Sequence, residues 1–390
     1  MGFSDFIGNE KVVAALRRML AADRVPHALL FAGPRGVGKY TLARMFAQAL
    51  NCERRGAHNQ GGLFAAAGPQ LTDDSCGACS TCEQIARLAD TAPLIQRGLA
   101  ERGAKPDTAT VERVPLLLQG HPDVWAIVPD PVRAQDPVKR PVIRMGQLRA
   151  VQRAAYFRPQ ARWRVFLVDG AETMASNNAN IFLKILEEPP ESSILILLAP
   201  SPYMLLDTIR SRCLPFFFAP LAPEQVEPFL KARAELKPPQ RKLVAQLSGG
   251  SPGAALTLDL EQNTRLRRRA LGLIEQGAAG RKMGEVFART AQMTKEEKES
   301  FEDLQDMFYS LLNDLLELSH SPESSLLRNP DLRGELLSLS QRAELQWVAR
   351  AVAALDEYYG RLRRNVNRQL GLDAWVAGLA PEEETAASPQ

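Results

Sequence analysis

The fold is decided by one stretch of the sequence, ALLFAGPRGVGKY at residues 28–40. The apolar run 28–31 predicts a buried strand, residues 33–39 fit the pattern G-x-x-x-x-G-K, and helical spacing follows over 41–50. The glycines let backbone N–H groups converge on phosphate oxygens, and the helix N-terminus and the Lys39 ammonium add positive charge. An unliganded glycine turn is the alternative, but such a turn rarely carries the lysine in register. The stretch therefore predicts a nucleotide-binding phosphate loop.

Two expected Mg²⁺ groups are altered around this loop. The residue after the loop lysine is usually Ser or Thr, whose hydroxyl ligates Mg²⁺, but it is Tyr40, and Thr41 comes one position too late to replace it cleanly. Asp169, after a predicted strand at 165–168, could still hold Mg²⁺ through water. The predicted nucleotide-binding residues are Gly33, Pro34, Arg35, Gly36, Val37, Gly38, Lys39, Tyr40, Thr41 and Asp169.

The group that activates the attacking water is also missing. Gly170 stands where an active ATPase of this kind usually has a glutamate, and Glu172, two positions further, is expected to point elsewhere once the turn has begun. Losing a water-activating group costs about 10²- to 10⁴-fold in rate. We therefore expect ATP or ADP to bind without appreciable turnover.

Four of the five cysteines have metal-ligand spacing. Cys76, Cys79 and Cys82 form C-x-x-C-x-x-C, and Cys52 lies upstream at the end of the predicted phosphate-loop helix. Four thiolates suffice for a closed tetrahedral zinc site, which has no open position for substrate and is therefore structural. An iron–sulfur cluster and unligated buried cysteines remain the alternatives.

Alternating strands and helices indicate an α/β domain over residues 1–220, with further strands at 123–128, 165–168 and 193–198. Such alternation predicts a parallel sheet with helices on both faces. An irregular, flexible insertion is expected over about 55–120, with the zinc module at about 52–82. Helical patterns then predict a small helical domain at 221–262, an all-α domain at 263–380 and a disordered tail at 381–390.

Composition narrows the class of protein without naming it. The chain has 390 residues, 45% of them hydrophobic and 24% charged, which suits two or three soluble domains. A formal net charge of +3 is too small to announce a nucleic-acid binder. No long apolar stretch or secretory signal is seen, so a cytoplasmic protein without membrane contact is expected.

Several strings together resemble the clamp-loader branch of the AAA+ proteins. They are FSDFIGN at 3–9, the phosphate loop, the four-cysteine module, LKILEEPP at 183–190 and SRC at 211–213. The likeness is close over about 1–55 and 120–220, modest to 260, and rests on helical character beyond. It implies an AAA+ P-loop domain, a helical lid domain and a C-terminal oligomerisation collar.

The resemblance also assigns a role to Arg212. In this family the arginine of S-R-C projects into the ATP site of the adjacent subunit, so Arg212 is the candidate arginine finger acting in trans. A guanidinium on a transferring γ-phosphoryl stabilises its developing charge, by about 10³- to 10⁵-fold in rate. Without the flanking motif, a surface or ion-paired arginine would be the simpler interpretation.

The missing parts indicate which branch the chain resembles. Gly253, after the Gly250-Ser251 dipeptide, stands where motor subunits carry a sensor arginine. Tyr40, Gly170 and Gly253 thus alter three catalytic positions, while S-R-C is intact. This combination resembles the pattern of the delta-prime subunits of DNA polymerase III. That likeness implies gamma/tau-type and delta subunits, the β sliding clamp and primed DNA as partners. An ATP-hydrolysing gamma/tau-type motor is the alternative, and a stand-alone zinc-dependent nucleic-acid binder is the third.

A cluster of arginines suggests where DNA could lie. Arg144, Arg149 and Arg153 lie in a region near a predicted helix and are our candidates for DNA phosphate contacts. A solvated helix face explains them nearly as well. The wider cluster comprises Arg140, Arg144, Arg149, Arg153, Arg158, Arg162 and Arg164.

Overall fold

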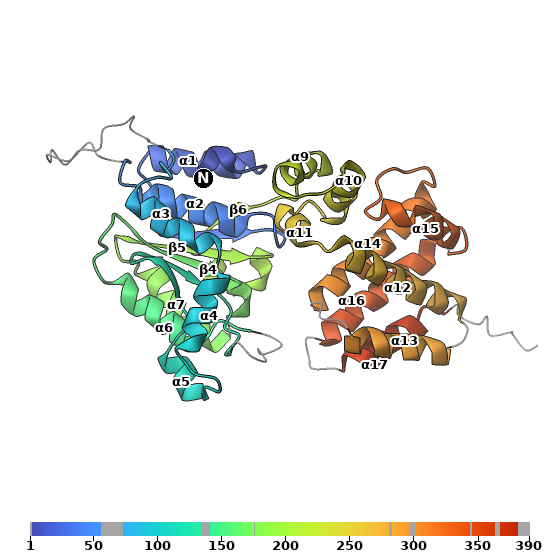
Figure 1. Ribbon diagram of the computed structural model, residues 1–390. Coiled ribbons are helices and arrows are strands. Elements are labelled where there is room, and N and C mark those ends of the chain that lie inside the picture. Colours follow the sequence, from blue (N-terminus) through green and yellow to red (C-terminus); the bar gives the residue numbers. More distant parts are fainter. Residues whose placement is uncertain are drawn as a thin grey trace, which may run out of the picture. The chain divides into compact units, whose positions relative to one another are not determined.

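The computed structural model describes two compact units (Figure 1). The described residues are 2–55, 73–133, 141–174, 176–280, 283–296, 301–343, 345–362 and 367–380. The first unit comprises Met1–Arg233 with Gly250–Ala254, and the second comprises Ala234–Gly249 with Ala255–Gln390. Each unit is considered by itself below.

The first unit is built on a six-stranded sheet of order β2-β3-β4-β5-β1-β6. The strands from β3 to β6 in this order run parallel, as the alternating pattern predicted, but β2 pairs antiparallel with β3 at one edge. Every residue of β1 and β5 is buried, because these central strands are covered on both faces. The strands are β1 Ala28–Ala32, β2 Leu118–His121, β3 Val124–Ile127, β4 Arg164–Asp169, β5 Ser193–Ala199 and β6 Leu214–Phe217.

Helices cover both faces of this sheet (Figure 1). On one face, α6 and α7 pack through Leu148, Val151 and Phe182 against Leu30 and Phe166 of the strands. On the other lie α1 and α2. The helices of the first unit are α1 Glu10–Ala21, α2 Lys39–Asn51, α3 Ser80–Ala86, α4 Ala92–Ala100, α5 Thr108–Arg113, α6 Met145–Ala155, α7 Ser176–Glu187, α8 Asp207–Arg210 and α9 Pro223–Arg233, with 3-10 turns η1 Phe3–Asp5, η2 Arg87–Ala89, η3 Ala171–Thr173 and η4 Pro202–Met204.

Most of the stretch that was expected to be an irregular insertion is regular. Residues 73–120 form α3, η2, α4, α5 and most of β2, whereas 56–72 lie outside the described residues. A fully buried ion pair fastens this part to the sheet domain: the Arg102 guanidinium donates to both Asp130 oxygens at 2.8 and 2.7 Å. The Arg102 Nε also donates to the Val114 carbonyl. Scattered Gly, Pro and Ala gave no sign of this anchor, because the partners lie 28 residues apart.

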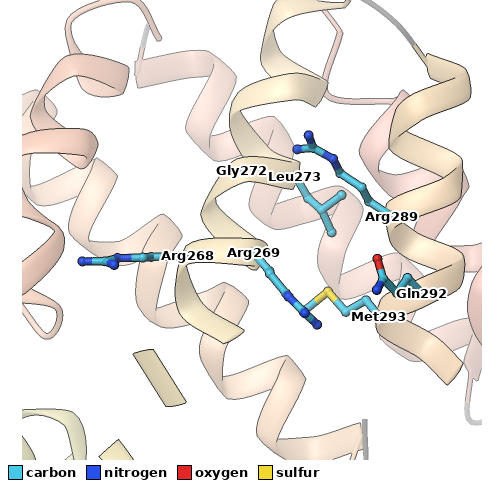
Figure 2. Close-up of a pocket in the computed structure, with 7 residues that line it drawn as sticks. All are labelled: Arg268, Arg269, Gly272, Leu273, Arg289, Gln292 and Met293. Carbon is cyan, nitrogen blue, oxygen red and sulfur yellow. The ribbon is translucent and has the colours of Figure 1, made fainter. Parts of the chain in front are cut away.

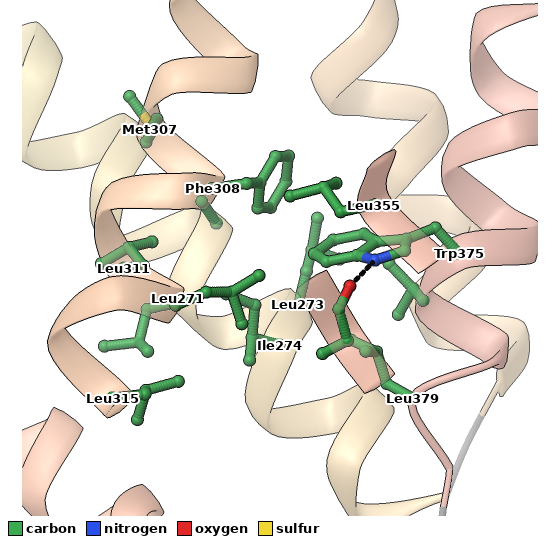
Figure 3. Close-up of a cluster of buried hydrophobic side chains, with 14 of the residues drawn as sticks. Leu271, Leu273, Ile274, Met307, Phe308, Leu311, Leu315, Leu355, Trp375 and Leu379 are labelled. Atoms are coloured by element: carbon green, nitrogen blue, oxygen red, sulfur yellow. Dashed lines mark hydrogen bonds between the residues drawn. The ribbon is translucent and has the colours of Figure 1, made fainter. Parts of the chain in front are cut away.

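The second unit is helical throughout its described residues. Its core gathers apolar side chains from α12, α14, α16 and α17 (Figure 3), where the Phe308 and Trp375 rings meet edge to face with centroids 4.8 Å apart. The Trp347 indole N–H donates to the Leu379 carbonyl, which satisfies a buried polar group. The elements are α10 Pro238–Leu247, α12 Leu260–Ala279, α13 Met283–Glu296, α14 Phe301–His320, η5 Pro330–Leu332, α15 Arg333–Ser340, α16 Leu345–Leu362 and α17 Arg368–Ala377.

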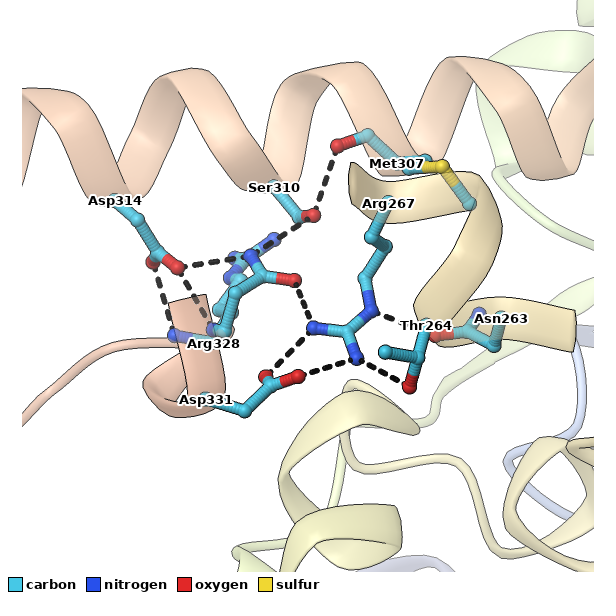
Figure 4. Close-up of polar contacts among 9 residues, drawn as sticks. Asn263, Thr264, Arg267, Met307, Ser310, Asp314, Arg328 and Asp331 are labelled. Atoms are coloured by element: carbon cyan, nitrogen blue, oxygen red, sulfur yellow. Dashed lines mark hydrogen bonds and ion pairs between the residues drawn. The ribbon is translucent and has the colours of Figure 1, made fainter. Parts of the chain in front are cut away.

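One buried arginine ties the loop before α15 to this core (Figure 4). Arg267 of α12 donates to both oxygens of Asp331, at 2.7 and 2.9 Å, and to Asn329. Asp314 of α14 accepts from the backbone and side chain of Asn329. A buried charge is tolerated only when it is paired in this way.

The predicted domain limits do not coincide with the limits of the two units. The helices expected for a lid domain at 221–262 are divided, since α9 groups with the first unit and α10 with the second; α11 Pro252–Thr257 crosses the limit. The lid and the collar at 263–380 stay predictions, and the tail at 381–390 lies outside the described residues. No helix in the described part of the chain is both long enough and apolar enough to span a bilayer.

The Arg102–Asp130 pair allows a stability test. Asp130→Asn leaves a fully buried guanidinium without its counter-charge, so we expect the first unit to lose about 3–5 kcal/mol. Mass-spectrometric hydrogen exchange of β3 and β4 measures this unit alone. The control Glu357→Gln breaks the exposed Arg361–Glu357 pair and should cost less than about 0.5 kcal/mol in α16. Unchanged exchange in Asp130→Asn would contradict the anchor.

Candidate functional site

The predicted phosphate loop joins β1 to α2 and is closely surrounded. Gly36 and Gly38 have φ of 73° and 102°, a conformation that favours glycine. A Cβ on Gly38 would lie 2.9 Å from the Phe6 ring, and one on Gly33 would lie 2.5 Å from the Phe218 carbonyl. The strand, loop and helix of the sequence prediction are therefore confirmed, with two phenylalanines packed against the loop that the prediction did not name.

The Lys39 ammonium is bound to its own loop. Its Nζ donates to the carbonyls of Gly33 at 2.6 Å and Pro34 at 2.8 Å, and the side chain is buried. Burial lowers the pKa of Lys39, while the charges of Asp169 and Glu172 oppose that shift. Two of the three ammonium donors are therefore used within the loop, and one remains for a phosphate.

Residues 253–254, which belong to the same unit, contact the loop at Gly36. The Gly253 N–H donates to the Gly36 carbonyl at 2.9 Å, and a Cβ on Gly36 would lie 2.9 Å from the Ala254 nitrogen. A Cβ on Gly253 would lie 3.0 Å from that same carbonyl. The position where motor subunits carry an arginine is thus a glycine in direct backbone contact with the loop.

Tyr40 is turned away from the loop. Its hydroxyl donates to the Leu88 carbonyl of η2 at 3.0 Å, and burial raises the pKa of the phenol. The hydroxyl therefore braces η2 against α2. Thr41 is half-buried in the first turn of α2.

Two carboxylates face the Lys39 ammonium. Asp169 ends β4, and burial raises its pKa although Lys39 lowers it. Burial likewise raises the pKa of Glu172, whose carboxylate interacts electrostatically with Asp169, Lys39 and Arg35. One Glu172 oxygen is buried with no hydrogen-bond partner among the described residues. Glu172, on η3, thus interacts electrostatically with the groups around the loop, and the direction of its side chain stays a prediction.

Gly170 explains why no glutamate follows Asp169. Its φ is 69°, and a Cβ there would lie 2.8 Å from the Pro129 ring. A glutamate at this position would be strained and would collide with Pro129.

The four cysteines of the predicted metal site converge. The sulfurs of Cys52, Cys76, Cys79 and Cys82 all lie within 4.8 Å of one another, which suits a tetrahedral metal whose Sγ ligands lie about 3.8 Å apart. The Cys76 N–H donates to Cys52 Sγ and the Cys79 N–H to Cys76 Sγ, each at 3.3 Å. A hydrogen bond from Cys82 lowers the pKa of Cys52 to about 5. Thiolate is thus favoured at Cys52, the form that binds a metal, whereas burial raises the pKa of Cys79 and the hydrogen bond with Cys52 raises the pKa of Cys82.

Arg212 lies at the surface just after α8. Its guanidinium forms an ion pair with Glu187 at 2.9 Å and donates to the Thr208 carbonyl at 2.9 Å. Its side chain is 37% exposed. Glu187 belongs to the LKILEEPP string, so two motifs that were separate in the sequence meet here. The sequence analysis did not predict that Glu187 pairs with Arg212.

The arginines predicted to contact DNA differ in exposure. Arg149 and Arg153 lie four residues apart on the exposed face of α6, whereas Arg144, before its first turn, is half-buried. Two exposed aromatic side chains, Tyr156 and Phe157, follow the helix. Arg140 lies outside the described residues.

Comparison with known proteins places the chain in a family. A family model described as "DNA polymerase III, delta subunit" matches residues 8–222, more than half of the chain, and one described as "DNA polymerase III, delta subunit, C terminal" matches 278–379. DNA polymerase III subunit delta' of Bacillus subtilis is 24% identical over 92% of both chains. The chain belongs to the delta-prime family of clamp-loader subunits.

Other members of the clamp-loader group are also similar to this delta-prime family chain. DNA polymerase III subunit gamma/tau of Mycobacterium tuberculosis is 33% identical over 66% of this chain, which spans only 36% of that relative's length. A solved gamma subunit-related protein of Thermotoga maritima covers 94% of this chain at 17% identity, with a TM-score of 0.38.

The cysteine cluster of this family member predicts one bound zinc per chain. Cys79→Ser should lose that zinc and lower the melting temperature, because a closed site contributes its binding free energy to folding. Atomic absorption measures the metal, and Cys213→Ala, at a buried cysteine outside the cluster, should keep it. Full zinc content in Cys79→Ser, or none in the wild type, would contradict the metal site.

Glu172 predicts a pH-dependent stability change. Because its folded pKa is raised, deprotonation destabilises the folded protein as pH rises through the window above the unfolded value of about 4.3. Glu172→Gln should therefore stabilise the protein by about 1 kcal/mol at pH 7 and give no gain at pH 4. Calorimetry from pH 4 to 8 measures this difference, with the exposed Glu191→Gln as control. A pH-independent effect would contradict the burial of charge at Glu172.

Proposed function

We propose that the chain is a delta-prime subunit of a DNA polymerase III clamp loader and promotes ATP hydrolysis in a neighbouring subunit. The observation that carries the proposal is the contrast between two sites. Arg212 presents an exposed guanidinium, whereas the chain's own loop is engaged by its own Lys39 and Gly253. The guanidinium proposed to serve a neighbour is thus at the surface, whereas the loop lysine of the chain's own site uses two of its three donors within the loop.

In this proposal Glu187 is a positioning residue for the arginine finger. The ion pair and the Thr208 carbonyl hold the guanidinium near the surface without burying it. An exposed pair of this kind is worth about 0.2–1 kcal/mol, so a γ-phosphoryl group in the adjacent site can displace Glu187. The ion pair thus positions the arginine finger before the neighbouring subunit binds, and breaking the pair costs little free energy.

The surface around Arg212 supports contact with another protein. The segment from η4 to β6 exposes several large apolar side chains, and the Arg210 guanidinium stacks over the Tyr203 ring at 5.0 Å. Apolar and aromatic groups of this size are enriched at subunit interfaces. The exposed side chains are Tyr203, Met204, Leu206, Leu214 and Phe217.

The chain's own site is proposed to bind ATP or ADP weakly and without turnover. Residues 33–39 keep the backbone donors of a phosphate loop, and Asp169 remains available to a Mg²⁺ ion through water. Tyr40, however, places its hydroxyl on Leu88, so no hydroxyl follows the loop lysine at the metal position.

Zinc is proposed as a structural ion held by Cys52, Cys76, Cys79 and Cys82. When bound, it would supply a covalent-like tie between α2 and α3 and no catalysis, because four thiolates leave no open position. Glu53 adds to this junction by accepting from the Thr81 backbone and hydroxyl.

Gamma/tau-type and delta subunits, the β sliding clamp and primed DNA are the proposed partners. Arg149 and Arg153, one helical turn apart, can follow phosphates, and Tyr156 and Phe157, 58% and 66% exposed, offer rings to bases or to a protein pocket. We place this chain in the cytoplasm, where these partners would meet it.

One observation favours the second candidate, an ATP-hydrolysing gamma/tau-type motor. Glu172 interacts electrostatically with Lys39 and Asp169, and burial raises its pKa above the ordinary value of a glutamate, the direction that a general base requires. In that case Glu172 would take the role of the missing glutamate at position 170.

Reconstitution with gamma-type and delta subunits, β clamp and primed DNA tests the proposal. Arg212→Ala should lower the ATPase rate of the complex by about 10²-fold or more while assembly survives. Arg210→Ala is the matched comparison: it removes a neighbouring arginine of the same proposed contact surface, so it can weaken assembly, but in the assembled complex it should change the ATPase rate by less than about threefold.

Two outcomes would overturn the assignment. Equal ATPase rates for wild type and Arg212→Ala would contradict the assignment of Arg212 as an arginine finger. Loss of assembly in Arg212→Ala but not in Arg210→Ala would show that Arg212 is a structural contact between subunits. A larger loss for Lys39→Ala than for Arg212→Ala would favour the motor.

A further inference from the structure

A hollow between α12 and α13 of the second unit is floored by packed side chains (Figure 2). Leu273 and Met293 are each only 2% exposed, and Arg269 at the border already has a partner. The contacts that lead further lie in the first unit. There, the segment 73–89, which carries three of the four clustered cysteines, is connected by side chains to the phosphate loop.

Asp74 fastens the N-terminal turn η1 to the 73–89 segment. Both Asp74 oxygens accept from the Phe3 N–H, at 3.1 and 2.9 Å, and the Phe3 side chain is buried. The Arg17 guanidinium of α1 pairs with the same carboxylate at 3.5 Å, and the Ser75 N–H donates to it at 2.7 Å. Asp74 stands two residues before the first cysteine of the segment. The position of η1 therefore depends on the position of the chain at that cysteine.

The turn η1 reaches the phosphate loop through Phe6. The Phe6 N–H donates to the Phe3 carbonyl at 3.2 Å, so the anchored turn also sets the position of Phe6. A Cβ on Gly38 would lie 2.9 Å from the Phe6 ring. The Gly38 carbonyl accepts from the Leu42 N–H of α2 at 2.9 Å. The aromatic ring thus covers the last glycine of the loop, directly before Lys39.

A second contact reaches the loop from the other end of the segment. The Tyr40 hydroxyl donates to the Leu88 carbonyl of η2 at 3.0 Å, and Leu88 is fully buried. The turn η2 follows α3 directly, and α3 is held on α2 by Gln48, whose amide donates to the Cys82 carbonyl at 2.8 Å. The residue after the loop lysine is therefore also contacted from the 73–89 segment.

The four cysteines join this segment to the end of the phosphate-loop helix. Cys52 is the C-cap of α2, and Cys76 follows 24 residues later and donates its N–H to Cys52 Sγ. When the four thiolates hold a metal, its binding free energy stabilises the folded position of the chain that carries the ligands. Asp74 and η2 belong to that chain. Their contacts with η1 and Tyr40 are then stabilised as well.

We infer that the four-cysteine site regulates the phosphate loop. A metal held by the cysteines orders the loop through Asp74 and Phe6 on one side and through Leu88 and Tyr40 on the other. The two sites are thus linked, and each ligand raises the affinity for the other by the same factor. This inference rests on the proposed function only for the identity of the two ligands, which are zinc and ADP or ATP.

Hydrogen exchange of the full chain, with zinc bound and after its removal by EDTA, measures the order of the loop. Peptides that cover Leu42 report the junction of the loop and α2, because the Leu42 N–H bonds to the Gly38 carbonyl. Removal of zinc should speed exchange there at least about fivefold. Exchange of the paired central strands β4 and β5 should change by less than about twofold in the same sample.

Variants test the two routes while the cysteines stay intact. Asp74→Ala frees η1 and should speed exchange at Leu42 about threefold with zinc still bound, because one of the two routes is lost. Asp107→Ala is the matched control: Asp107 also accepts from a backbone N–H, but it caps α5, so exchange at Leu42 should stay unchanged. In the double variant of Asp74→Ala and Tyr40→Phe, removal of zinc should alter exchange at Leu42 by less than about twofold.

Binding of the fluorescent nucleotide mant-ADP gives a second readout. Its Kd for the wild type should rise at least about fivefold when zinc is removed, and the affinity for zinc should fall by the same factor when the nucleotide is omitted. If mant-ADP does not bind the zinc-loaded chain, the proposed nucleotide binding fails, while exchange at Leu42 still decides whether the cysteine site orders the loop.

Three results would overturn the inference. The first is equal exchange at Leu42 with and without zinc. The second is equal exchange at Leu42 in the wild type, Asp74→Ala and the double variant. The third is exchange of β4 and β5 that speeds up as much as exchange at Leu42 when zinc is removed, which would make the metal a requirement of the whole sheet domain and not a regulator of the loop.

Discussion

The hydrogen bonds from Lys39 to the carbonyls of Gly33 and Pro34 are the interaction on which the functional interpretation depends. They can form because both ends of the loop are fixed in position. The loop starts at the end of β1, which is paired with β5 and β6, and it ends at the first turn of α2. An ammonium has three donors, so two of them already bond within the loop and one is left for a phosphate. The chain thus has the architecture of a phosphate loop, with part of its charged donor engaged internally.

The other departures around the loop have the same physical consequence. Gly253 lies against Gly36 with no room for a side chain, and Gly170 adopts a conformation that a glutamate would resist. The Tyr40 hydroxyl donates a hydrogen bond to the Leu88 carbonyl. Each substitution contributes to packing within the first unit, so loss of catalytic groups and gain of internal contacts occur together. Arg212, by contrast, is held by an exposed ion pair with Glu187 and a hydrogen bond to the Thr208 carbonyl.

Local patterns predicted what depends on neighbours in sequence. The strand, loop and helix at 28–51 follow from local spacing, and the spacing of the four cysteines allowed the convergence that the structure shows. Contacts between distant residues did not follow: Arg102 meets Asp130 across 28 residues, and Gly253 meets Gly36 across the whole sheet domain. The positive φ at Gly170, which leads into the 3-10 turn that carries Glu172, is likewise not visible in the residue order.

The central claim is an asymmetry: the chain completes a neighbour's site and does not turn over nucleotide in its own. The most direct measurement is steady-state ATP hydrolysis by a reconstituted complex in which every gamma-type subunit carries an alanine in place of its loop lysine. The account predicts no hydrolysis above background, because only the loop at Gly33–Lys39 of this chain remains intact. Residual hydrolysis that disappears with Lys39→Ala would contradict it.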